Sequence, residues 1–221
     1  MQQDNISILK ITNIIWDENS NNYKKLPKEL DLQWNNSEWT NNEVSNWLKK
    51  EIDIILDAYK NESMSKETRF LMIEDTINYN FAGTGIAKFV AGDSWKTANN
   101  DTKKEYIKIF KRHLALNIAS MMQGYSNEEY ALINSQYDSK NKINLIDMEI
   151  YNNTGSLIVT WRVKKSKERY YVIDLLVADI SIVVTKRSEF NSMLKNVNYS
   201  LKELNIILEK QNGTSYQKLI N

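Results

Sequence analysis

Alternating apolar residues between Leu157 and Val177 constrain the fold of this chain more than any other feature. Successive side chains of a β-strand point to opposite faces, so two strands joined by a polar turn at 164–169 would place every second residue on one face. The sequence therefore predicts a hairpin with one continuous apolar face that something must cover. The residues of this face are Leu157, Val159, Trp161, Val163, Tyr171, Ile173, Leu175 and Val177.

Helical periodicity dominates on both sides of a run of short strands. Apolar stripes predict helices from Thr40 to Tyr59 and at about 65–78, 102–124, 180–195 and 200–211. Capping-box pairs favour helix starts at Thr40, Thr102 and Ser200. Strands are predicted at 129–138, 143–151, 155–164 and 169–178, and their short connections favour antiparallel pairing. This order predicts an α+β fold, in which an antiparallel sheet of about four strands packs against several helices around an apolar cavity.

Residues 1–40 differ in composition from the rest of the chain. They are polar and rich in Asn, and they hold Trp16, Trp34, Trp39 and the single proline, Pro27. Because disordered segments are usually poor in aromatic residues, we expect an edge strand or an ordered arm at 6–16. The chain is therefore divided into an N-terminal extension at 1–40, one domain at 41–212 and a C-terminal tail at 213–221.

Composition and motifs argue against several function classes. A net charge of +1 argues against a nucleic-acid-binding surface, and no stretch approaches the roughly eighteen apolar residues of a transmembrane helix. The chain has no cysteine and one histidine, His113, for which a partly buried structural role is favoured over catalysis or ligation. Gly83-Thr84-Gly85 is too short a match to indicate a phosphate-binding loop. The sequence predicts a protein that is not an enzyme and has no cofactor and no metal site.

Three blocks of residues carry a family resemblance. The first is Phe81 followed by Val90-Ala91-Gly92 and Trp95-Lys96, and the second is Tyr106, Phe110 and Leu114 followed by Ile118, Met122 and Tyr125. The third is Trp161-Arg162, Tyr171, Asp174, Ile180-Ser181, Thr185, Arg187 and Phe190. In this order and spacing, the chain from about Thr40 to Asn212 resembles the Mla-type family of periplasmic lipid carriers, also called toluene-tolerance proteins.

The resemblance implies a periplasmic phospholipid carrier of the pathway that maintains outer-membrane lipid asymmetry. Its partners would be an inner-membrane ABC-type lipid transporter complex and an outer-membrane lipoprotein–porin complex. The sequence shows no secretory signal, so we expect that this signal has been removed. Two departures concern local structure: His113 and Ile118 stand where the family often has Tyr, and Ala178-Asp179 stands where it usually has Glu-Gly. The departure at His113 and Ile118 affects the shape of the pocket, and the departure at Ala178-Asp179 affects the local turn.

We expect the lipid tails to lie between the apolar sheet face and the long helix at 102–124. Such binding needs a dry apolar cavity and no reactive group. The predicted lining residues are Phe89, Val90, Phe110, Leu114, Ile118, Met121, Met122, Leu157, Val159, Trp161, Ile173, Leu175, Val177 and Val184. Two alternatives stay open: a carrier of another lipid such as a hopanoid, and a structural or adaptor module of the same fold whose own side chains fill the cavity.

Basic residues gather near the predicted strand turn and the helix that follows. One interpretation is a solvated turn and helix start, where charged side chains are common. The other is a contact for a lipid headgroup or a partner, because Lys and Arg bind phosphate well. Both interpretations stay open for Lys164, Lys165, Lys167, Arg169, Lys186 and Arg187.

Overall fold

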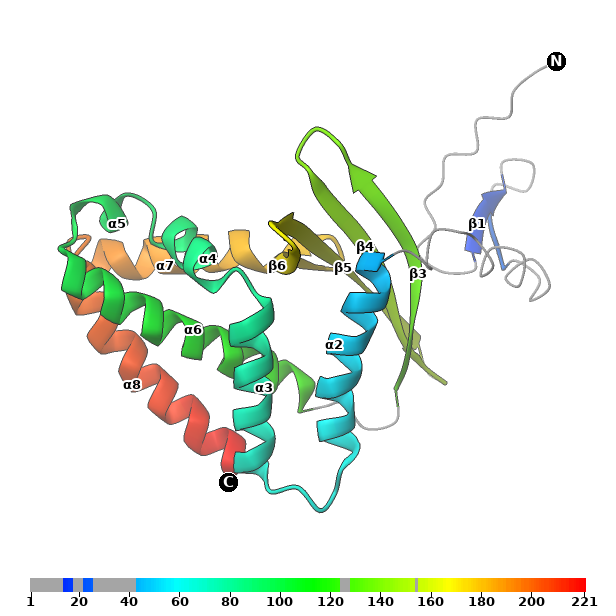
Figure 1. Cartoon of the computed structure of the whole chain (residues 1–221), viewed down its shortest axis with the longest axis horizontal. Coiled ribbons are helices and arrows are strands. Elements are labelled where there is room, and N and C mark those ends of the chain that lie inside the picture. Colours follow the sequence, from blue (N-terminus) through cyan, green and yellow to red (C-terminus); the bar gives the residue numbers. More distant parts are fainter. Residues whose placement is uncertain (1–13, 18–21, 26–42, 124–127, 154) are drawn as a thin grey trace.

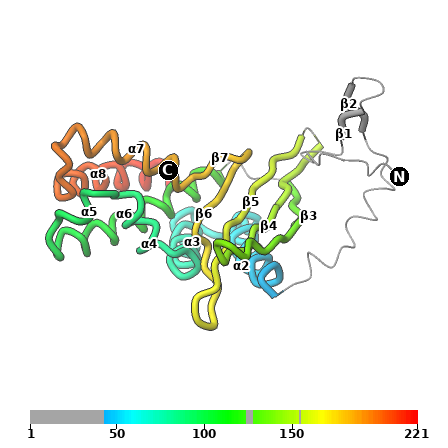
Figure 2. The backbone as a smooth tube through the Cα atoms, turned by 90° about the horizontal axis from the view of Figure 1, so that it is seen from above, coloured from blue at the N-terminus to red at the C-terminus, as the bar shows by residue number. Residues whose placement is uncertain are grey.

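A five-stranded antiparallel sheet lies beside a group of helices in the computed structural model of the chain (Figure 1). The structure describes residues 14–17, 22–25, 43–123, 128–153 and 155–221. Helices both precede and follow the sheet in the sequence, and most of them gather beyond one edge of it (Figure 2). The predicted α+β class is confirmed.

The strands of the sheet follow one another in sequence order, so strands that are adjacent along the chain pair in space. They are β3 (Glu129–Asp138), β4 (Ile143–Asn152), β5 (Gly155–Ser166), β6 (Arg169–Val177) and β7 (Ile180–Ser181). The first four match the predicted strands closely. The two-residue strand β7 was predicted as helix, but it pairs Ile180 with Val177 across a tight turn.

A separate two-stranded hairpin consists of β1 (Ile14–Asp17) and β2 (Asn22–Lys25). It includes the end of the arm that was expected at 6–16. The rest of that arm, like Trp34 and Trp39, lies outside the described residues.

Seven helices occur in the described part of the chain. Helix α6 lies beside α8, and the two are joined by side-chain hydrogen bonds from Asn205 Nδ2 to the carbonyl of Thr102 and from Asn212 Nδ2 to the carbonyl of Ile109. The helices are α2 (Glu43–Lys60), α3 (Lys66–Asn80), α4 (Gly83–Ala91), α5 (Asp93–Thr97), α6 (Asn100–Met122), α7 (Ile182–Asn196) and α8 (Leu201–Ile220).

Two helix ends differ from the prediction. Thr102 was predicted to cap α6, but the Asn99 side chain is the cap and accepts a hydrogen bond from Thr102 N at 2.8 Å. Helix α8 was predicted to end near 211, yet it continues to Ile220 and buries Leu219. Residues 213–220, which were set apart as a tail, are therefore helical. The cap predicted at Thr40 lies outside the described residues.

A β-bulge in β6 reverses part of the predicted apolar face. Trp161 pairs with Leu175, but Val163 pairs with Val172, which leaves Ile173 as an extra residue on β6. An extra residue inverts the alternation of side chains beyond it. Tyr171 and Ile173 were therefore wrongly placed on the face of Leu175, and Val172 occupies that face instead.

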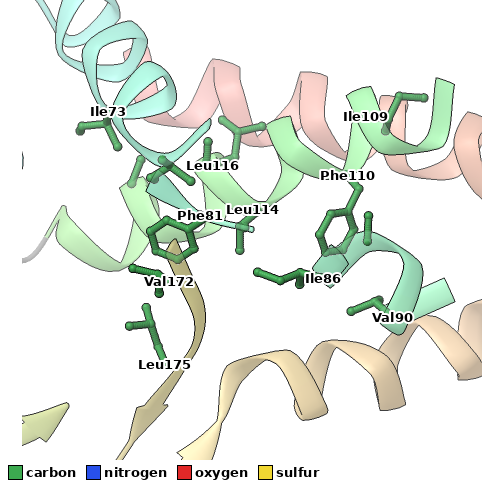
Figure 3. Packing of buried hydrophobic residues seen from close by; sticks show 14 of the residues in the cluster. Ile73, Phe81, Ile86, Val90, Ile109, Phe110, Leu114, Leu116, Val172 and Leu175 are labelled. Carbon is green, nitrogen blue, oxygen red and sulfur yellow. The ribbon is translucent and has the colours of Figure 1, made fainter. Parts of the chain in front are cut away.

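The apolar face of the sheet packs into a core that it shares with the helices. Val172 and Leu175 of β6 lie near Phe81 and Leu114, and Ile86 and Val90 of α4 lie beside Phe110 of α6 (Figure 3). Phe81 also pairs with Val172 as an isolated parallel bridge, and Ala82 N donates to the Val172 carbonyl at 2.9 Å. The junction between α3 and α4 is thereby fixed to the edge of β6.

Candidate functional site

Most of the predicted lining residues meet in one hydrophobic cluster between the sheet and the helices. The long helix α6 and the strands β5 and β6 supply most of them, as the sequence predicts. Val90, Phe110, Leu114, Val159 and Leu175 are buried there, and none is more than 9% exposed. Ile118, Met122, Trp161 and Val177 are partly buried against the same cluster.

The other predicted residues lie apart from this cluster. Phe89, Met121, Leu157 and Val184 are exposed, with 45%, 56%, 42% and 56% of their surface accessible to solvent. Ile173 lines a surface pocket instead, because the bulge turns it away from Leu175. The structure does not bring all the predicted residues around one enclosed space. Their role in lipid binding stays a prediction.

One end of the apolar sheet face is incompletely covered. Leu157 of β5 is exposed, and its partner Ile150 on β4 is only half-buried. Val177 at the end of β6 is half-buried as well. Since apolar surface is unfavourable in water, an uncovered apolar sheet end is typical of a place that a ligand or a partner covers.

Trp161 lies in the middle of the same face, between Ile146 and Leu175. Its ring meets Phe81 edge-on, with 6.5 Å between the ring centroids. The indole Nε1–H is buried and has no hydrogen-bond acceptor within the described part of the chain. A buried donor without an acceptor costs about 1–3 kcal/mol, so an acceptor on a bound molecule would stabilise this side chain.

Asp174 fixes the start of α7 to the sheet. Its buried carboxylate accepts hydrogen bonds from Ser181 Oγ at 2.6 Å and from Val183 N at 3.1 Å, and it lies 3.4 Å from Arg162 Nη1. Ser181 Oγ in turn accepts from Val184 N at 3.0 Å, which caps α7. These contacts hold the first turn of α7 beside the end of β6.

Two pockets open near the junction of α3 and α4. The first, of about 550 Å³, is lined by Glu51 of α2 and by Asp75 and other residues of the last turns of α3. The second, of about 450 Å³, lies between this junction, Lys111 of α6 and the β5–β6 hairpin. Of the buried cluster, only Phe81 is among the residues that line either pocket. Nine of the fourteen residues predicted to line a cavity lie in or against the buried cluster.

The basic residues do not form one patch. Lys165 pairs with Glu43 at 3.5 Å, Lys186 pairs with Glu189 at 2.7 Å, and Arg187 Nη1 donates to the Phe89 carbonyl at 2.6 Å. Lys164 and Arg169 instead line the second pocket. The solvated-surface interpretation fits the first group, whereas the second group lies where a ligand could reach it.

His113 has the contacts of a structural residue. Its Nδ1 lies 3.0 Å from Asn212 Oδ1, its ring packs against Phe190, and burial lowers the pKa of its imidazole. The described residues contain no group of three or more His, Asp or Glu side chains placed to hold a metal ion. Within the same residues, no helix combines the length and the apolar character needed to cross a membrane.

Lys111, Tyr79 and Asn78 of the second pocket were not predicted from the sequence. Lys111 is one of several lysines along α6, and nothing in the neighbouring sequence distinguishes it. Its place is set by a close crossing, because a Cβ added at Gly83 would lie 2.9 Å from Lys111 Cε. Such a tertiary contact leaves no periodic signal in the sequence.

Comparison with known proteins supports the resemblance. The family model described as MlaC protein matches residues 49–209. Among solved structures, the fold is similar to that of a phospholipid-binding protein from Ralstonia solanacearum in complex with a phospholipid. That match has a TM-score of 0.66 and 16% identity, and it covers 76% of this chain and 96% of the other. No curated protein matches the chain.

Proposed function

The chain belongs to the MlaC protein family, and from this premise we propose that it is a periplasmic carrier that binds a phospholipid. It would shuttle the lipid between the inner and the outer membrane. Residues 41–212, together with the remainder of α8 up to Ile220, would form the carrier domain, and 1–40 an extension of it.

The observation that carries this proposal is the incompletely covered end of the apolar sheet face, at Leu157 and Val177. Two acyl tails expose on the order of several hundred Å² of hydrocarbon, and at roughly 25 cal/mol per Å² their burial contributes about 10 kcal/mol before ordering costs. The structural neighbour from Ralstonia solanacearum, which has the same fold, holds a phospholipid. The flexible side chains of Met121 and Met122 suit a surface that must adapt to acyl chains.

The proposed contact surface extends from this sheet end toward the partly buried cluster. Its core would be Leu157, Trp161 and Val177 of the sheet with Ile118 and Met122 of α6, all of which keep some exposure or lie at the edge of the core. The buried residues Val90, Phe110, Leu114, Val159 and Leu175 would come into contact with a lipid only if the helices move away from the sheet. Phe89, Met121 and Val184 would then form the rim, and Ile173 would face the second pocket.

Lipid loading tests the proposal directly. The purified chain is incubated with phospholipid vesicles and re-isolated, and its bound lipid is measured by native mass spectrometry. We expect a bound diacyl phospholipid, and we expect Leu157→Gln to reduce loading by roughly tenfold because a polar side chain then replaces a buried apolar contact. Ile206→Gln is the matched control, since Ile206 is 57% exposed on α8. A wild-type protein that takes up no lipid would overturn the carrier function.

A self-filled structural or adaptor module is the second candidate. The complete burial of residues such as Phe110 and the contact between Phe81 and Trp161 favour it, because these side chains occupy much of the predicted cavity. A self-filled module would bind no lipid in the loading experiment, and the amount of bound lipid would be the same for the Leu157 and Ile206 variants. The same mass spectra would reveal a hopanoid, should the carried lipid belong to that class.

The proposed route has two ends. The lipid would be exchanged with an inner-membrane ABC-type lipid transporter complex and with an outer-membrane lipoprotein–porin complex, as the family relationship suggests. Transfer of labelled phospholipid from the loaded chain to membranes that carry either complex tests each end separately. Equal transfer to membranes without these complexes would contradict the route and leave lipid binding intact.

A further inference from the structure

The second pocket has a volume of about 450 Å³, and we call it the hairpin pocket because the β5–β6 hairpin supplies part of its lining. This lining is unusual for a solvated surface. Three cationic side chains line it, Lys111 of α6, Lys164 of β5 and Arg169 of β6, and no Asp or Glu is among its lining residues. Within the described residues, none of the three forms an ion pair. Like charges around one hollow repel one another, so the pocket is electrostatically complementary to an anion.

Arg169 is held in place before any ligand arrives. Its guanidinium stacks on the Tyr79 ring at 3.3 Å and lies 4.9 Å from the centre of the Tyr171 ring. One of its nitrogens donates to the Tyr79 carbonyl. A guanidinium fixed in this way loses little freedom on binding, and its remaining N–H groups suit the oxygens of a phosphate.

The wall opposite the hairpin supplies further polar groups. Gly83, Thr84 and Gly85 begin α4, where no side chain caps the helix, and they line the same pocket. Backbone N–H groups in the first turn of a helix have no partner within the helix. Asn78 also lines the pocket, and its buried Oδ1 has no donor within the described part of the chain.

The hairpin pocket adjoins the apolar surface proposed for the lipid. Phe81 lines the pocket and also meets Trp161 on the sheet face. Lys111 closes the other side, since its chain lies against Gly83 where any larger residue would meet it. A phosphate bound by the three cations would therefore lie beside the Phe81–Trp161 part of the proposed acyl-binding surface, and the acyl tails would run from there along the sheet face toward Leu157 and Val177 at its other end.

We infer that the hairpin pocket binds a phosphate ester through Lys111, Lys164 and Arg169. The phosphate can come from the headgroup of a carried phospholipid or from a free small phosphate ester. The first source rests on the proposed carrier function, whereas the second does not.

Titration with glycerol 3-phosphate tests the free source. The full chain, stripped of lipid, is followed by heteronuclear NMR, and we expect the amide resonances of 83–85 to shift. The double variant Lys111→Gln/Lys164→Gln should bind roughly tenfold more weakly, because it loses two charge-assisted contacts. The matched control is Lys108→Gln/Lys140→Gln, which removes two exposed lysines outside the pocket and should bind as the wild type does.

Competition between a phospholipid and a diacylglycerol with the same chains tests the lipid source. The wild type should retain the phospholipid in preference, and the double variant should lose that preference while its melting temperature stays that of the control. Equal phosphate binding by the double variant and the control, with no lipid preference in either, would overturn the inference.

The two proposals fail in different ways. If lipid loads without regard to its phosphate and glycerol 3-phosphate does not bind, the hairpin pocket has no such role and the carrier function stands. If glycerol 3-phosphate binds in the pocket but no lipid loads, the carrier function falls and the phosphate site stands.

Discussion

Ala178 and Asp179 form the turn between β6 and β7 with positive φ angles of 47° and 64°. This conformation costs an Ala roughly 1–2 kcal/mol, because its Cβ crowds the following carbonyl, whereas Asp tolerates it better. The resemblance described above implies Glu-Gly at these two positions, so this chain forms the turn without a glycine. The contacts of Asp174 with Ser181 and Val183 hold the turn from outside.

Ala178→Gly should therefore stabilise the protein. Relief of the strained φ outweighs the added freedom of glycine in the unfolded chain. We therefore expect the free energy of unfolding, measured by urea denaturation, to rise by about 0.5–1 kcal/mol. Asp179→Gly is the comparison and should give a smaller gain. A loss of stability in Ala178→Gly would show that the Ala side chain makes contacts that compensate for the strain.

His113 should make stability depend on pH below neutrality. Burial lowers the pKa of His113 below its ordinary value of 6.5, so the unfolded chain takes up a proton at a higher pH than the folded chain does. The free energy of unfolding then falls as the pH drops below 6.5 toward the lowered pKa. Comparison with His113→Gln from about pH 7.5 to about pH 5.5 isolates the effect, and the wild type should lose more stability than the variant. If the free energy of unfolding changed with pH in the same way in both proteins, His113 would not be the cause of the pH dependence.

At the scale of the helices, Gly92 and Gly213 differ in whether the backbone requires a glycine. Gly92 joins α4 to α5 with φ 58° and ψ −132°, a region that is nearly closed to other residues. Gly213 lies inside α8, and a Cβ added there meets nothing within 4 Å. The backbone conformation, more than the space for a side chain, decides whether another residue is tolerated at each position.

Gly92→Ala should destabilise the protein by about 1–3 kcal/mol, and Gly213→Ala should stabilise it by roughly 0.5–1 kcal/mol. The strained backbone explains the first change and the better helix propensity of Ala explains the second. Urea denaturation measures both, and each variant serves as the control of the other. A stabilising Gly92→Ala would mean that the junction of α4 and α5 adapts to an ordinary conformation.

The strands could be predicted from the sequence because their signal is local. Alternation between Leu157 and Val163 and polar turns at both ends locate β5 and β6 within a few residues. The bulge at Ile173 has no such signal, since only pairing across strands reveals it. Helix α8 was predicted too short because Asn212 and Gly213 resemble a helix end, but Asn212 is buried and donates to the Ile109 carbonyl.

The candidate site was predicted less completely than the fold. Burial of Phe110, Val159 and Leu175 follows from periodicity, yet periodicity treats core and binding surface alike, so it cannot separate them from Leu157 at the uncovered sheet end. The hairpin pocket needs Lys111 to meet Gly83 and Arg169 to stack on Tyr79. Those contacts join α3, α4, α6 and β6 and depend on the whole tertiary arrangement.

At the scale of the whole molecule, the sheet and the helices are held together strongly at one end of their interface and weakly at the other. The buried side chains of Phe81, Val172 and Leu175 close one region, whereas Leu157 and Val177 stay accessible at the other. A ligand that covers the open region binds the folded state alone, because the unfolded chain has no such surface. Binding and folding are then linked by mass action.

Lipid-loaded protein should therefore melt at a higher temperature than protein stripped of lipid. At a hundredfold excess over the dissociation constant the added stability is about 2.7 kcal/mol, which for a chain of this size corresponds to roughly 5–10 °C. Differential scanning calorimetry of both forms measures this difference in melting temperature. The Leu157→Gln variant should show a smaller difference than the wild type, and the Ile206→Gln variant should show the same difference as the wild type. A self-filled module predicts the same melting temperature with and without lipid, since its apolar face has no place left for a ligand to cover.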